Sequence, residues 1–174
     1  VRAAPPLTLT GVEFTLTNVR WSHRLQLHAI PPASVARPVQ VVAALRAHRV
    51  NDLRNWNGTV DATVAGVSFS HLSAWLELPY QPQRGWGALN MQLNVAHGTL
   101  AGMTAALELH DIEATLGEAL PALRLAQVRG QARWQREPDG YRVTFDNLRV
   151  ARPGAALGAP FNAGLSWGGA SHEI

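Results

Sequence analysis

The sequence predicts a mainly β protein, built as a large, curved, mostly antiparallel sheet that forms an open groove or half-barrel with one short helix. Apolar and polar residues alternate along most of the 174-residue chain, as in the run from Ala88 to Val95. Side chains on a strand alternate between two faces, so each such run predicts a strand with one apolar side and one polar side. Glycine and proline separate these runs, and only one segment has the periodicity of a helix.

In the N-terminal half, the alternation predicts strands at residues 7–17, 24–29, 39–46 and 59–65, with a short continuation at 67–69. The proline-rich stretch 31–38 predicts a long turn or a bulge, because proline removes ladder donors. Asp52, Asn55 and Asn57-Gly58 give residues 48–57 the composition of a turn.

The one convincing helix is expected after these strands. Ser70 is a suitable N-cap, and Leu72, Trp75 and Leu76 fall on one helical face. Pro79 ends the pattern, which limits the helix to about two turns. A helix of this length is too short to cover a wide sheet.

In the C-terminal half, a loop is expected at 82–87 and one irregular helical turn at 117–121. His97-Gly98 suits a tight turn, and Glu137-Pro138-Asp139-Gly140 is a strong hairpin signal. Glycines 58, 87, 98 and 130 predict bends or bulges of a strongly curved sheet. The predicted strands are residues 88–95, 98–109, 112–116, 123–128, 130–135, 141–150 and 161–167.

The composition fits one domain, spanning residues 1–174, and disfavours nucleic acid as a partner. All 15 basic residues are arginine, the net charge is only +3, and the arginines are spread singly along the chain rather than gathered in a patch. The chain has no cysteine, and no run of residues is apolar enough for a membrane-spanning helix. Because the chain starts at Val1 close to a predicted strand, we expect a segment of a longer protein whose anchor lies outside it.

The sequence holds no constellation that enzymatic chemistry requires, so we expect no catalytic residues, no metal and no cofactor. Serine-hydrolase elbows, phosphate-binding glycine loops and HExxH motifs are absent. Glu108 and His110 share the polar side of one predicted strand and could share a metal, but a solvated strand face is the favoured interpretation. The six tryptophans leave open a carbohydrate-binding module with exposed stacking platforms.

Several packing and turn motifs resemble the body of the YhdP family, an AsmA-like family of Gram-negative bacteria. The motifs are residues 9–14 (LTGVEF), 23–27 (HRLQL) with 31–32 (PP), 37–39 (RPV), 56–60 (WNGTV), 72–75 (LSAW), 120–123 (LPAL), 130–134 (GQARW) and 140–141 (GY). The resemblance implies a segment of a taco-like β-groove on the periplasmic side of the inner membrane. It implies transport of phospholipid between the two membranes, with neighbouring segments of the same long chain as partners and no catalytic residues.

An apolar groove could bind acyl chains without specific polar contacts, because each buried methylene contributes about 0.8 kcal/mol. The residues predicted by alternation to line it are Leu25, Leu27, Val41, Val60, Val64, Leu89, Met91, Leu93, Leu107, Val143 and Phe145. The alternative is a closed β-sandwich that serves as a structural or interaction module, with its two apolar faces covering each other.

Overall fold

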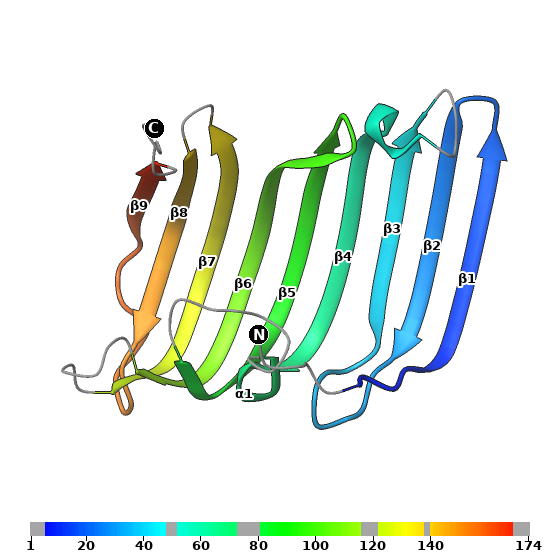
Figure 1. The fold of residues 1–174 in the computed structure, drawn as a ribbon. Coiled ribbons are helices and arrows are strands. Elements are labelled where there is room, and N and C mark those ends of the chain that lie inside the picture. The colour runs from blue at the N-terminus through cyan, green and yellow to red at the C-terminus, as the bar shows by residue number, and fades with distance from the viewer. Residues whose placement is uncertain (1–5, 48–51, 73–80, 116–121, 138–139, 169–174) are drawn as a thin grey trace, which may run out of the picture.

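The computed structural model describes residues 6–47, 52–72, 81–115, 122–137 and 140–168. Nine strands follow one another in a single antiparallel sheet in chain order (Figure 1). The elements also include a 3-10 turn, η1 (Leu53–Asn55), and a short helix, α1 (Phe69–Leu72). The strands are β1 (Thr10–Val19), β2 (Ser22–Ile30), β3 (Val39–Arg46), β4 (Asn57–Ser68), β5 (Gln81–Ala96), β6 (Thr99–Thr115), β7 (Leu123–Glu137), β8 (Gly140–Ala151) and β9 (Phe161–Gly168).

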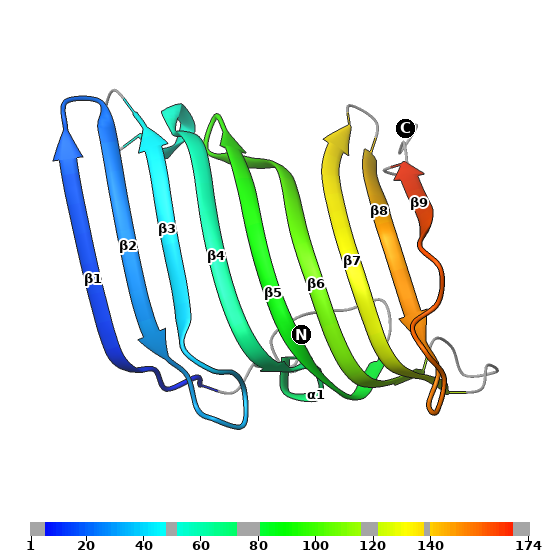
Figure 2. The ribbon, with the colours of Figure 1, turned by 180° about the vertical axis from the view of Figure 1, so that it is seen from behind.

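The sheet is open and curved, as predicted. Figure 2 shows the strands bending toward one end and the edge strands β1 and β9 standing apart on opposite sides. The extensive contacts between elements join strands that are neighbours in the sheet, and α1 packs against the ends of β4 and β5. The described strands therefore form one layer, which differs from the two packed sheets of the sandwich alternative.

Tight turns set the register of the hairpins. His97 and Gly98 have φ values of 51° and 70° and join Ala96 to its partner Thr99, as predicted. Such left-handed turn residues match the twist of the flanking strands. Glu137 pairs with Gly140 as the hairpin signal predicted, although the two residues between them lie outside the described part.

Several strands are longer than the alternation indicated. Residues 82–87, predicted as a loop, belong to β5, and the pairs 98–109 with 112–116 and 123–128 with 130–135 are the single strands β6 and β7. Irregularities at Pro82/Arg84 and Arg129/Gln131 shift the register without ending the ladder. In β6, Asp111 and Ile112 lie opposite the single residue Gly85 of β5, and Asp111 has a φ of 50°. This bulge changes the phase of the alternation, which explains why β6 looked like two strands.

The helix starts two residues earlier than predicted. Because α1 begins at Phe69, Ser70 lies inside it and Ser68 takes the N-cap position. The Ser68 Oγ atom lies 2.8 Å from Nδ1 of His71. The rest of the predicted helix, with Trp75, Leu76 and Pro79, and the turn predicted at 117–121 lie outside the described residues.

Close strand approach explains two of the glycines that the sequence singled out. A Cβ atom on Gly58 would collide with the backbone oxygen of Ala44, and one on Gly87 would collide with that of Glu108. Gly58 also has a φ of 150°, and this backbone conformation would be strained in a residue with a side chain. Glycine at both positions is therefore a requirement of the strand pairing.

Candidate functional site: an uncovered apolar face

The register aligns apolar side chains in rows across the sheet. In an antiparallel pair, residues directly opposite each other point to the same face. One row crosses all nine strands without a polar residue: Leu16, Leu25, Ala43, Val60, Leu93, Met103, Trp134, Val143 and Leu165. We call it the first row.

Two further rows lie beside the first on the same face. The second row, also apolar throughout, is Phe14, Leu27, Val41, Ala62, Met91, Ala105, Ala132, Phe145 and Ala163. The third row, from β2 to β6, is Ala29, Val39, Val64, Leu89 and Leu107. Together these rows are the apolar face.

All eleven residues predicted to line a groove lie on the apolar face. Four are in the first row, four in the second, and Val64, Leu89 and Leu107 are in the third. The sheet thus brings the whole predicted set onto one surface. Whether that surface binds lipid remains a prediction.

Sequence reasoning missed several members of these rows, including Met103, Trp134 and Ala105. The stretch Leu100-Ala101-Gly102-Met103 has no clean alternation, because the pairing of β5 with β6 is irregular between Asn94 and Val95. Trp134 does alternate with its polar neighbours, and that signal could have placed it on the apolar side.

The apolar face is not covered by a second layer within the described residues. The buried hydrophobic residues are all alanines or valines, and no large side chain there is fully buried. Leu25, Leu93 and Met91 in central strands are only half-buried, and at the edges Phe14 is 58% and Leu165 64% exposed. A contiguous apolar surface of this extent on a folded protein marks an interaction site.

Near one end of the strands, the apolar rows give way to a small polar-aromatic cluster. His23 is buried at 4% exposure, its Nδ1 lies 2.7 Å from Oδ1 of Asn18, and its ring stacks on Trp56 with centroids 5.5 Å apart. The Trp56 Nε1 atom is buried without a hydrogen-bond partner in the described part. On β1 and β2, the apolar face ends at this cluster.

The opposite face is polar. Its two rows beside the first and second apolar rows hold mostly hydroxyl, amide and charged side chains. They are Thr17, Arg24, Ala44, Thr59, Asn94, Gly102, Gln135, Arg142 and Ser166, and Thr15, Gln26, Val42, Asp61, Gln92, Thr104, Arg133, Thr144 and Gly164. We call this surface the polar face.

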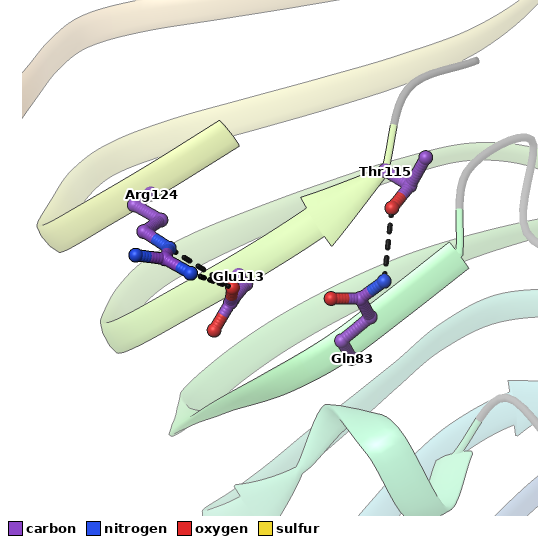
Figure 3. Close-up of polar contacts among 4 residues, drawn as sticks. All are labelled: Gln83, Glu113, Thr115 and Arg124. Atoms are coloured by element: carbon purple, nitrogen blue, oxygen red, sulfur yellow. Dashed lines mark hydrogen bonds and ion pairs between the residues drawn. The ribbon is translucent and has the colours of Figure 1, made fainter. Parts of the chain in front are cut away.

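Polar side chains also join neighbouring strands near the end of the sheet that holds α1. The Nη2 and Nε atoms of Arg124 each lie 2.9 Å from Oε1 of Glu113, and Gln83 Nε2 donates to Thr115 Oγ1 at 3.0 Å (Figure 3). Because Arg124 is 70% exposed, this ion pair fixes geometry more than it adds stability.

The Glu108–His110 pair is an interaction of the polar face. Oε1 of Glu108 lies 3.7 Å from Nε2 of His110, and His110 stacks on Trp86 with centroids 4.4 Å apart. Groups of three or more potential metal ligands are absent from the described part of the chain. A pair alone supplies too few ligands for a metal centre of the usual kind.

The tryptophans divide between environments. Trp86 is 50% exposed on the polar face and donates from Nε1 to Asp111 Oδ2 at 3.2 Å, whereas Trp134 lies on the apolar face. Trp75 and the side chain of Trp167 lie outside the described residues.

Within the described ranges, no helix has the length and hydropathy to cross a bilayer.

The fold and this surface define a class of protein: an open, single-layer β-sheet with one continuous apolar face and one polar face. A family model for the YhdP protein matches residues 6–170, which is nearly the whole chain. The chain belongs to the YhdP family, an AsmA-like family of bacterial envelope proteins. The resemblance seen in the sequence motifs is thereby confirmed. Neither a curated protein nor a solved structure matches the chain.

Proposed function

We propose that this chain is a segment of an intermembrane phospholipid-transport conduit that binds acyl chains non-specifically on its apolar face. The observation that supports this most is the pair of apolar rows that cross all nine strands without a polar interruption. No chemical step is part of this function, and no cofactor takes part.

The dimensions of the rows suit an acyl chain. Nine strands spaced about 4.8 Å apart make each row roughly 38 Å long. One leaflet supplies about half of the roughly 30 Å hydrocarbon core of a bilayer. A row is therefore longer than one acyl chain, and a chain can shift along it with no loss of contact.

The chemistry of the rows suits movement. Each methylene that leaves water gains about 0.8 kcal/mol wherever it lies on an apolar surface. Hydrogen bonds would instead hold a lipid at fixed positions, and the first and second rows offer no side-chain hydrogen-bonding group apart from the Trp134 indole. The apolar face therefore favours binding without a preferred position.

The proposed setting is the periplasmic side of the inner membrane, with neighbouring segments of the same long chain as partners. Every residue of β1 is exposed, including Phe14 and Leu16 of the apolar rows. An unpaired edge of this kind is a template for a further strand. A strand added at β1 would extend both apolar rows.

Tryptophan quenching tests which face meets lipid. We expect phospholipid with a spin-labelled acyl chain to quench Trp134, because Trp134 lies in the first row, and to leave Trp86 on the polar face unquenched. The measurement is fluorescence during lipid titration of the wild type, Trp134→Phe and Trp86→Phe.

The Trp134→Phe variant should lose the larger share of the quenching, and Trp86→Phe should retain it. The reverse pattern would place the lipid on the polar face and refute the proposal. Quenching by a soluble polysaccharide ligand but not by lipid would favour the carbohydrate-binding alternative.

A further inference from the structure

The polar face holds a hollow of ≈ 450 Å³ over β5 to β8. The small side chains of Ala88 and Ala106 leave the space open, and Leu157, from the segment after β8, also lines it. Two arginines, Arg129 and Arg149, line the hollow together with amide side chains. Its volume falls within the range of small-ligand sites.

The two arginines are direct cross-strand partners. Arg129 of β7 pairs with Arg149 of β8, so their Cβ atoms stand about 4.5–5.5 Å apart on one face. Like charges placed directly opposite each other destabilise a sheet. Among the described residues, neither guanidinium is in an ion pair, since the carboxylates of the ion pairs there belong to other partners.

One carboxylate, that of Glu108, shares the hollow. Glu108 is the register partner of Arg129 on β6, but its Oε1 atom is directed to within 3.7 Å of His110. The row of Glu108, Arg129 and Arg149 therefore keeps one positive charge in excess. Both arginines are exposed, so a ligand can reach them from solvent.

The backbone next to the arginines departs from regular strand geometry. A bulge in β8 places Asn147 and Leu148 opposite the single residue Gly130 of β7, and Asn147 has a φ of 52°. The N–H of Asn147 donates to Asn162 Oδ1 of β9 at 2.9 Å, which holds this conformation. The bulge places the side chains of Gln131 and Asn147 at the hollow beside the arginines.

We propose that this hollow binds an anionic ligand through a phosphate group held by Arg129 and Arg149. Guanidinium groups match phosphate oxygens in bidentate geometry, and a bound anion would relieve the repulsion between the two arginines. The amides of Asn90, Gln131 and Asn147 supply donors for the rest of the ligand. The site lies on the face opposite the acyl-chain surface, so it stands independently of the conduit.

The phosphate has two possible sources, a soluble phosphate ester or a phospholipid headgroup. Calorimetric titration of the chain with glycerol 3-phosphate tests the first, and co-sedimentation with phosphatidylglycerol vesicles tests the second. In at least one of these two experiments, we expect Arg149→Gln to weaken binding about tenfold or more. This is the loss in affinity expected when one charge-assisted hydrogen bond is removed. Vesicle binding alone that depends on Arg149 would identify the headgroup as the source.

Two further variants separate a site from general charge. Glu108→Gln removes the one carboxylate that lines the hollow among the described residues, and it should tighten binding severalfold. Arg24→Gln removes the same charge from the polar face on β2, far along the sheet, and should change binding less than twofold. Circular dichroism checks that each variant keeps its strand content.

The proposal is overturned if neither ligand binds, or if Arg24→Gln weakens binding as much as Arg149→Gln. A Glu108→Gln variant with unchanged affinity would also contradict it. Leu93→Asp, on the opposite face, should leave phosphate binding intact, so failure of the conduit and failure of this site are distinguishable.

Discussion

Leu93→Asp should abolish phospholipid binding while the sheet stays folded. Leu93 lies near the middle of the first row, between Val60 and Met103, and is half-buried. The change removes an apolar side chain whose burial contributes about 1.5–3 kcal/mol, and it puts an unpaired carboxylate against the acyl chain. We expect affinity for a fluorescent phospholipid to fall by about 100-fold or more.

The matched control for this experiment is Asn94→Asp. It adds the same charge to the next residue of β5, but on the polar face. We expect it to bind lipid like the wild type. Wild-type binding by a folded Leu93→Asp variant, or equal losses in both variants, would contradict the assignment of the apolar face.

Gly87→Ala should destabilise the sheet, although it adds only one methyl group. A Cβ atom on Gly87 would collide with the backbone oxygen of Glu108 on β6, and Leu109 leaves no room to shift, with Cδ2 at 2.9 Å and Cα at 3.0 Å. Overpacking of this kind costs about 1–3 kcal/mol. Denaturant unfolding followed by circular dichroism measures the change in unfolding free energy.

Gly102→Ala provides the comparison. Gly102 is also buried within a strand, but its added Cβ would meet nothing closer than the Trp134 backbone oxygen at 3.4 Å. It should leave stability unchanged or raise it by about 0.5–1 kcal/mol, since alanine loses less backbone entropy than glycine. Equal changes in unfolding free energy for the two substitutions would show that the close approach of β6 to Gly87 does not exclude a side chain there.

The sheet and its apolar face could be predicted because their cause is local. Alternation in β2, β3 and β5 assigns Leu25, Val41 and Leu93 to one side of their strands without knowledge of the partners. Strand pairing then only had to place these apolar sides next to one another on the same face of the sheet. The eleven predicted residues came together on one face for this reason.

Strand ends and turns were less predictable, because they depend on pairing between strands. Arg20 and Trp21 form the two-residue turn between β1 and β2, yet neither residue type signals a turn. Arg20 adopts a φ of 51° because the register of Val19 with Ser22 requires it. In the same way, the pairing of β6 with β7 continues past Asp111, although the alternation of apolar and polar residues in β6 breaks there.

The arginine pair of the polar face was also hidden from sequence reasoning. Arg129 and Arg149 are twenty positions apart and look like two of many scattered charges. Only the register of β7 with β8, shifted by the bulge in β8 opposite Gly130, places them opposite each other. A bulge is a property of two strands together, so one strand's sequence does not locate it.

The most direct test of the conduit is mass spectrometry of an organic extract of the chain, purified without detergent. We expect phospholipid in the extract of the wild type and of Asn94→Asp, with mixed acyl chains because the rows have no specific contacts. We expect none in the extract of Leu93→Asp. A stable, folded monomer of the wild type that yields no lipid would contradict the conduit and would favour a structural or interaction module.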